Sequence, residues 1–423
     1  MASAMRSPPK APHALTHGMR QLGPGLITGA ADDDPSGIAT YSQAGAQFGL
    51  AMLWTVVFTL PLMAAIQLVS ARIGYVTGAG LSANIRRHYP RWILHACVPM
   101  LFGANTLNIA ADLAAMAEAL RLLVGGSAHV YAVTFGLMCL VLQVFVPYSR
   151  YVRWLKWLTM ALLAYVAVVL SVRIDWIAVA RAVVWPRLPG GHDTLLMIVA
   201  VLGTTISPYL FFWQASQEVE DKAFRRHSAQ EVGRELARIR LDTLVGMTFS
   251  SVIAFCIMLS TAVTLHAAGL RNIQTSAQAA EALRPIAGQF TFLLFGLGII
   301  GTGMLAVPVL AGSAAYAVAG ATGWRGSLSL RLDHGEGRRF YGVIAAATIG
   351  GVILCFTPAD PVKELFWTAV INGVVAVPIM AVLMRLASNP RVMGAHVISR
   401  RVRWLGWLTT ALMGATVVGM FLT

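Results

Sequence analysis

Three consecutive aspartates, Asp32 to Asp34, stand inside a segment that is otherwise apolar, and Pro35 and Gly37 follow them closely. Proline has no amide hydrogen and clashes with the preceding turn, so a helix breaks at such a position. Carboxylates within a membrane are costly unless they face water, a cation or a polar partner. The pattern therefore predicts a cation site at a broken helix. The alternative, a kink used only for packing, leaves three carboxylates unexplained.

A second interruption lies at Pro208, which follows a short run of small and hydroxyl residues. Within that run, Thr204 and Ser207 can offer oxygen atoms to the same cation. Taken alone, this break fits a packing kink equally well. Tyr209 and Gln214 come next, and each can hold a water or the ion, or simply pack.

The segments that carry these breaks belong to a chain of 423 residues that is 57% hydrophobic and 12% charged. A soluble domain of this size needs more charge on its surface. The apolar residues form long blocks, and a bilayer core needs about 20 such residues per helix. We therefore predict an all-α membrane protein with eleven spans: 23–46, 50–71, 93–119, 128–147, 154–172, 194–216, 241–265, 289–319, 341–357, 364–384 and 402–422.

Basic residues alternate with these spans. With the N-terminus placed inside, most of the 32 Lys and Arg residues fall in inside segments, as the positive-inside rule requires. The net charge of +14 is thus explained without nucleic acid. The chain is predicted to be a basic cytoplasmic tail, 1–20, followed by a single transport domain, 21–423. The lipid bilayer is its expected surrounding, and no obligate protein partner is indicated.

The two broken spans are the first and the sixth, so they are separated by five spans. An odd number of spans per repeat inverts the second copy relative to the first. Matching breaks in two inverted halves indicate an ion site near the bilayer midplane, where alternating access operates. No nucleophile–base pair or metal-ligand cluster indicates an enzyme, and no cofactor is expected.

These residues resemble the NRAMP family of divalent-metal transporters. Asp34-Pro-Ser-Gly37 resembles the family's Asp-Pro-Gly-Asn motif, and Thr204 to Tyr209 resembles Ala-Thr-Val-Met-Pro-His. Further similar stretches follow in the same order, so the resemblance covers about residue 21 to the end. It implies a LeuT-type inverted repeat of spans 1–5 and 6–10, with helices 1 and 6 broken and an eleventh helix.

The departures from the family motifs bear on selectivity. The metal-binding aspartate is retained as Asp34, whereas Gly37 stands at the asparagine ligand and Ser207 at the methionine ligand. Tyr209 replaces the histidine that the family associates with proton coupling. The resemblance thus implies a metal site formed by Asp34, Gly37, Thr204 and Ser207.

The third span carries a further departure. Ala115 replaces a family glutamate, while Asp112 remains and Glu118 lies about one turn further. Together with Asp32 and Asp33, these carboxylates are assigned to the permeation path or to coupling. Tyr209 and Gln214 complete that set.

A methionine sulfur favours transition metals, whereas Mg²⁺ prefers oxygen and retains several waters. The sequence therefore resembles the NRAMP-related magnesium transporters of prokaryotes. We expect transport of Mg²⁺ and Mn²⁺, with Fe²⁺ as a further candidate. Proton coupling should be weak or absent, because a tyrosine of ordinary pKa, about 10, carries protons poorly.

Two alternatives stay open: a proton-coupled Mn²⁺/Fe²⁺ symporter and an organic-solute carrier of the same fold. The richness in Ala, Arg and Gly suggests a bacterial inner membrane.

Overall fold

The computed structural model describes residues 23–146, 150, 160–186, 190–224, 232–332, 335–357 and 360–423. Within these ranges the ordered structure is helical, with no strand. Seven helical stretches are long and apolar enough to cross a membrane, or eight if the bent pair Met160–Ser171 and Trp176–Val184 forms one span. The predicted tail, 1–20, lies outside the described residues.

The chain from its first described residue to Phe224, just beyond the second break, contributes ten described α-helices. They are α2 (Pro24–Asp32), α3 (Pro35–Phe48), α4 (Leu53–Thr77), α5 (Leu81–His88), α6 (Arg91–Val124), α7 (Ala128–Phe145), α9 (Leu163–Ser171), α10 (Trp176–Val184), α11 (His192–Thr205) and α12 (Pro208–Phe224).

The second half continues with eight more within the described ranges. They are α13 (Val232–Thr261), α14 (Ser276–Ala280), α15 (Arg284–Ala287), α16 (Thr291–Thr322), α17 (Gly335–Leu354), α18 (Pro361–Ser388), α19 (Pro390–Met393) and α20 (Arg400–Leu422).

Each of the eleven predicted spans overlaps a helix or a helix pair, although 154–159 of the fifth lies outside the described residues. The first span is the pair α2 and α3, and the sixth is the pair α11 and α12. The charged segment between the sixth and seventh predicted spans, 217–240, is helical over much of its described part, since α12 continues to Phe224 and α13 begins at Val232. Charge pairs three residues apart, such as Glu235 with Arg238, support these extensions.

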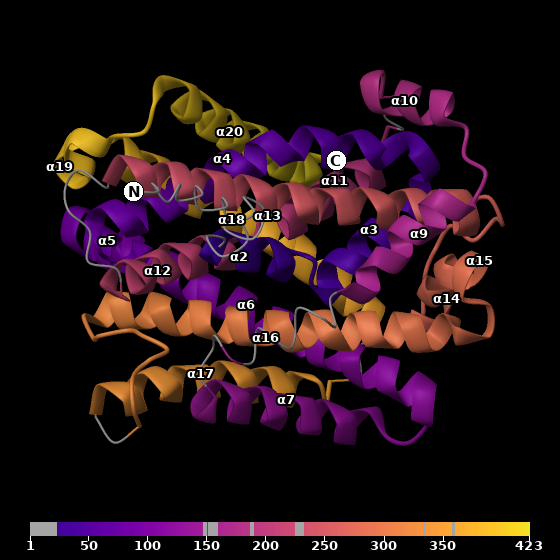
Figure 1. The fold of residues 1–423 in the computed structure, drawn as a ribbon, viewed down its shortest axis with the longest axis horizontal. Helices are drawn as coiled ribbons and strands as arrows, with labels where there is room; N and C mark the ends of the chain where they lie inside the picture. Colours follow the sequence, from indigo (N-terminus) through magenta and orange to yellow (C-terminus); the bar gives the residue numbers. More distant parts are fainter. Residues whose placement is uncertain are drawn as a thin grey trace, which may run out of the picture.

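The long helices run roughly side by side, and the short helices lie at the two ends (Figure 1). Helices α10, α14 and α15 lie at one end, called here the α10 end. Helices α5 and α19 lie at the other, called the α5 end. The broken helices occupy the centre: α13 packs along α2 and α3, and α11 packs along α18.

The second break is supported by a close contact between two helix backbones. Gly203 of α11 lies against α18 so tightly that a Cβ there would overlap with the carbonyl oxygen of Ala369 and the backbone of Gly373. Small residues allow this approach, which supplies van der Waals packing between helices in lipid. The end of α11 is thereby held at a defined position two residues before its break.

Candidate ion site at the helix breaks

The first break separates α2 from α3 at the end of the aspartate run. Asp34 has extended backbone angles, φ −73° and ψ 170°, and is the N-cap of α3. Its side chain accepts a hydrogen bond from the amide of Gly37 at 2.7 Å, and Pro35 occupies the first helical position. A capping aspartate followed by proline is a favourable helix start. The same local rule that breaks the span therefore holds the Asp34 carboxylate at the break.

The second break lies between Thr205, the last residue of α11, and Pro208, the first of α12. The Ser207 hydroxyl oxygen is 2.9 Å from the Gly203 carbonyl oxygen and 2.7 Å from that of Thr204. A hydroxyl that donates its hydrogen to a carbonyl retains lone pairs that can accept a hydrogen bond or ligate a cation. Ser207 thus satisfies the end of α11 and leaves oxygen lone pairs at the break.

The two breaks lie against each other. The Tyr209 hydroxyl of α12 is 3.3 Å from Oδ2 of Asp34 and 3.1 Å from the carbonyl oxygen of Ala31. Nearly two turns into α3, the Tyr41 hydroxyl is 2.9 Å from the Thr205 hydroxyl. These contacts join residues 164 to 178 positions apart, so the fold brings together the two segments that the sequence singled out.

The Gly37 position faces the second break directly. A Cβ placed there would lie 3.2 Å from Oγ1 of Thr204 and 3.4 Å from Oδ1 of Asp34. A side chain at this position would therefore occupy space between the two breaks. Glycine leaves that space free and offers only its backbone.

The other two aspartates of the run turn toward α13. The Ser250 hydroxyl oxygen is 2.6 Å from Oδ2 of Asp32 and 3.1 Å from Oδ1 of Asp33. The remaining carboxylate oxygens, Oδ1 of Asp32 and Oδ2 of Asp33, are buried without a hydrogen-bond partner. Among the described residues, no basic side chain forms an ion pair with any aspartate of the run. Buried carboxylates in this situation need a cation, a proton or water.

Asp112 of α6 joins the group from a third helix. It is fully buried, and the Ser36 backbone amide is near its carboxylate, but no side chain of the described residues hydrogen-bonds to it. Its charge interacts with that of Asp34 and lies close to Tyr209. The expected polar partner in the third span thus lies beside the first break.

Two residues assigned to the permeation path or to coupling, Glu118 and Gln214, lie away from the two breaks. The Glu118 carboxylate forms a 2.6 Å ion pair with Arg121 and lines a separate cavity of about 210 Å³ with His129. Six residues along a helix correspond to about 9 Å, so Glu118 lies well beyond Asp112 on α6. Gln214 donates to the Thr243 hydroxyl at 2.9 Å, on the α5 side of the break. Within the described part of the chain, neither side chain forms a hydrogen bond or ion pair with a residue of the two breaks.

The donor set at the breaks is made of oxygen. Within the described ranges, no three His, Cys, Asp or Glu side chains converge in a geometry that could hold a metal ion. The arrangement thus combines the single Asp34 carboxylate with neutral hydroxyl and carbonyl oxygens from both breaks. Such a set suits a hard cation that retains part of its water shell.

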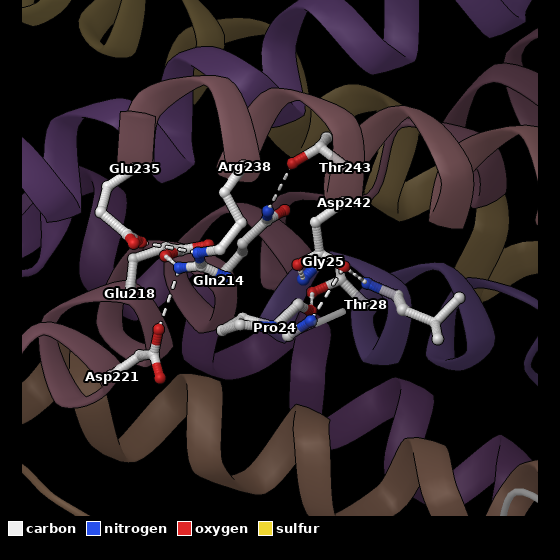
Figure 2. A network of polar contacts seen from close by, with 12 residues as sticks. Pro24, Gly25, Thr28, Gln214, Glu218, Asp221, Glu235, Arg238, Asp242 and Thr243 are labelled. Atoms are coloured by element: carbon white, nitrogen blue, oxygen red, sulfur yellow. Dashed lines mark hydrogen bonds and ion pairs between the residues drawn. The ribbon is translucent and has the colours of Figure 1, made fainter. Parts of the chain in front are cut away.

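A cavity approaches the breaks from the α10 end. It has a volume of about 520 Å³ and is lined by residues of α3, α11, α18 and the segment before α14, among them Gln43, Asp193 and Arg271. A narrow cavity of about 20 Å³ shares Ala39 with it and includes Ile38, one turn after Asp34. On the α5 side, polar contacts join α13 to α2 and to α12 (Figure 2).

Sequence reasoning did not identify Ser250, Tyr41 or Thr205 as part of this site. Ser250 lies 217 residues or more from the aspartates that it contacts. It is one of several serines in a long apolar span, and no local pattern distinguishes it. Only the packing of α13 along α2 selects it.

Comparison with known proteins identifies the family to which the chain belongs. The chain matches the family model "Natural resistance-associated macrophage protein-like", abbreviated Nramp, over residues 25–423. It is 25% identical over 411 residues to the divalent metal cation transporter MntH of Klebsiella pneumoniae, covering 95% of this chain and 94% of that protein. It is 30% identical over 292 residues to MntH of Yersinia pestis, covering 67% and 68%.

Solved structures share the fold. The Eremococcus coleocola manganese transporter, in complex with a bis-isothiourea compound, matches with a TM-score of 0.75 at 18% identity, covering 97% of this chain and 89% of that one. The nucleobase-cation-symport-1 family transporter MHP1 matches at 0.61 and 15% identity, covering 95% and 90%. The predicted fold class is confirmed. A match that spans almost the whole chain, on this shared fold, makes this multi-pass integral membrane protein a transporter of the Nramp family.

Proposed function

We propose that the protein transports divalent metal cations, Mg²⁺ as well as Mn²⁺, by alternating access, with Asp34 as the main ligand. Fe²⁺ is a further candidate substrate. The observation that carries the proposal is a single carboxylate facing neutral oxygens across two helix breaks. The Klebsiella and Yersinia relatives are named divalent metal cation transporters, and the Eremococcus neighbour is a manganese transporter.

The ligands proposed beside Asp34 are backbone or hydroxyl oxygens at Gly37, Thr204 and Ser207. All four positions border the space between the breaks, as the Gly37–Thr204 approach and the Ser207 hydrogen bonds indicate. Mg²⁺ dehydrates reluctantly and usually binds through one or two carboxylates while retaining waters. The absence of a thioether at position 207 removes the ligand that would favour softer metals over Mg²⁺.

Weak or absent proton coupling is the second part of the proposal. The Tyr209 hydroxyl is held by Asp34 and the Ala31 carbonyl, where a histidine would offer an imidazole. The membrane potential alone acts on a divalent ion with about 4.6 kcal/mol per 100 mV, twice the single-charge value. Ion accumulation therefore needs no proton gradient.

A proton-coupled symporter remains the second candidate because of Asp112. This carboxylate is buried beside Asp34 and, among the described residues, has no side chain as a hydrogen-bond partner, which is an arrangement suited to exchanging a proton. An organic-solute carrier has no comparable support. The likeness to MHP1 concerns the fold alone.

Uptake into liposomes tests both parts. Mg²⁺ or Mn²⁺ is added outside vesicles that contain a metal dye and a pH dye, with and without an imposed membrane potential. We expect uptake of both ions, driven by the potential, without matching acidification. Strong exclusion of Mg²⁺ in competition with Mn²⁺ would overturn the substrate assignment. Acidification that scales with metal uptake would replace the uncoupled mechanism with the symporter.

We further propose eleven transmembrane helices within 21–423, a cytoplasmic N-terminus and location in a bacterial inner membrane. The distribution of basic residues supports this orientation. It places the α5 end in the cytoplasm and the α10 end outside. No cofactor or obligate protein partner is part of the proposal. Side-specific labelling of single cysteines at the two ends tests the orientation.

A further inference from the structure

Three residues of α13, each four positions after the last, follow α2 along its length: Asp242, Gly246 and Ser250, called here the docking stripe. Positions four apart lie on the same face of a helix. Its first residue, Asp242, contacts Gly23, which immediately precedes α2, and its last residue, Ser250, contacts the aspartate run. α2 therefore lies on one continuous face of α13.

Asp242 holds the start of α2. Its carboxylate accepts hydrogen bonds from the backbone amides of Gly23, Gly25 and Leu26 at 3.0, 2.8 and 3.1 Å (Figure 2). Pro24 has no amide hydrogen, so Asp242 accepts a hydrogen bond from every backbone N–H group between positions 23 and 26. The N-cap residue of α2 is a glycine and supplies no side-chain cap of its own. A helix start without such a partner leaves backbone donors unsatisfied.

Gly246 holds the middle of α2 by contact between backbones. A Cβ at Gly246 would overlap with the Gly25 carbonyl oxygen, and one at Gly29 would overlap with the Gly246 carbonyl oxygen. Ser250 holds the end of α2 through Asp32 and Asp33. The helix is thus fastened at its start, middle and end by a single partner helix.

The neighbouring turn of α13 fastens the second broken span. Arg238 approaches Glu218 and Asp221 of α12 at 3.5 and 2.9 Å, and Thr243 accepts the Gln214 hydrogen bond (Figure 2). Helix α13 therefore holds the α5-side halves of both broken helices. These are the segments that close the ion site on the side proposed to be cytoplasmic.

Helix α2 has nine residues, too few to be stable alone in water, so its position depends on what it packs against. Asp34 lies two residues after its end, and Ala31, in its last turn, receives the Tyr209 hydroxyl. A shift of α2 away from α13 would carry Asp34 away from Tyr209 and open the cytoplasmic side.

We propose that Asp242 is a positioning residue of the ion site, acting through α2. Docked on Asp242, α2 closes the cytoplasmic side and holds Asp34 at the second break. Released from Asp242, it exposes the site to the cytoplasm. The proposal deepens the proposed function and rests on Asp34 being the ion ligand, but its main measurement does not depend on which ion is carried.

The test uses a reporter cysteine, Thr28→Cys, in the full-length protein with Cys97, Cys139, Cys256 and Cys355 replaced by alanine. Thr28 is fully buried in the docked α2. The rate of reaction with a membrane-impermeant maleimide is measured in inside-out vesicles. In parallel, the dissociation constant for Mn²⁺ is measured on the purified protein by calorimetry.

Asp242→Ala should weaken Mn²⁺ binding about tenfold, as expected when the docked population falls tenfold, and should raise the cytoplasmic labelling rate several-fold or more, because that rate follows the released population. Asp242→Asn retains an acceptor oxygen but loses the charge, and it should give intermediate values. It also serves as the test variant if Asp242→Ala does not fold. A purely structural defect would lower yield without a graded, side-specific change in labelling.

A matched control is available in Asp175, which caps α10 by the same chemistry. It accepts the amides of Ile177 and Ala178, both at 3.0 Å, at the α10 end. Asp175→Ala should leave both measurements unchanged. Labelling and Mn²⁺ binding of Asp242→Asn equal to those of the parent would overturn the proposal. Normal transport by Asp34→Asn would instead overturn the proposed ion site, whatever the labelling rates show.

Discussion

The two helix breaks have matching places in the inverted repeat but different chemistry. The first carries three carboxylates, and its cap is the side chain of Asp34 itself. The second carries only hydroxyl groups, and Ser207 satisfies its carbonyls within one turn. At the first break, carboxylate oxygens of Asp32 and Asp33 have no hydrogen-bond partner, whereas at the second break the Ser207 hydroxyl and the carbonyl groups hydrogen-bond to one another.

This difference teaches that the repeat determines where the backbone opens, while the side chains determine what each opening does. In the proposed site, the first break would supply the electrostatic attraction for a cation. The second would supply neutral oxygens and the Tyr209 hydroxyl, which contacts the Asp34 carboxylate. Substitutions at the two breaks should therefore differ in size, and the following predictions are ordered by that size.

The largest effect is expected at the charged break. Asp34→Asn retains the shape of the side chain but removes the charge, and a cation loses its strongest electrostatic partner. Divalent-ion uptake should fall by more than about 100-fold, beyond the range for residues that only support a ligand. Uptake into liposomes measures this, with Asp175→Asn as the exposed control. Near-normal uptake would mean that the charged break does not bind the ion.

A smaller effect is expected where the two breaks touch. Tyr209→Phe removes the hydroxyl between Asp34 and the Ala31 carbonyl without changing the ring. Loss of a supporting hydrogen bond typically weakens metal binding about 10- to 100-fold. Calorimetric titration with Mn²⁺ measures the change. Unchanged affinity would show that Asp34 is oriented by its own helix cap alone.

The neutral break should control selectivity more than rate. Ser207→Met introduces a thioether, a soft ligand that favours Mn²⁺ over Mg²⁺. The preference for Mn²⁺ should rise roughly tenfold, equivalent to about 1.4 kcal/mol. Competition between the two ions during uptake measures the ratio. Ser207→Leu, which has similar bulk but no sulfur, is the control, and an equal shift there would assign the effect to size.

The smallest effect is expected for a purely structural contact of the neutral break. Thr205→Val removes the hydroxyl that meets Tyr41 at 2.9 Å. A typical hydrogen bond contributes about 1 kcal/mol net, so thermal stability should fall slightly and uptake should change less than about twofold. A thermal melt in detergent together with the uptake assay measures both. A loss of uptake as large as that of Asp34→Asn would contradict the proposal that the two breaks have different roles.

Local rules were sufficient to predict the breaks. A helix cannot continue through Asp34 and Pro35, because proline removes a donor and aspartate caps the next helix. The apolar spans and the all-α class follow from the bilayer, which requires each segment to satisfy its own backbone. The family resemblance and the LeuT-type fold, both confirmed, rest on the same segments. These features depend on residues within a few positions of one another.

Tertiary structure decided which partner most of the buried polar side chains contact. It directed Asp32 and Asp33 to Ser250, and it attached the start of α2 to Asp242, 217 residues from Gly25. Gln214 of α12 was paired with Thr243 of α13 instead, whereas Glu118 pairs with Arg121 three residues further along the same helix, a contact that needs no tertiary structure.

The physical reason is that a buried polar group must find a partner wherever the packing places one. In the sequence, Glu118 and Asp112 are both acidic residues of one span. In the fold, one meets an arginine near the helix end and the other lies beside Asp34. The sequence by itself determined where the chain would break and which charges it carries there. Only the packing of α6, α12 and α13 around the break decided which of those carboxylates meets the second break.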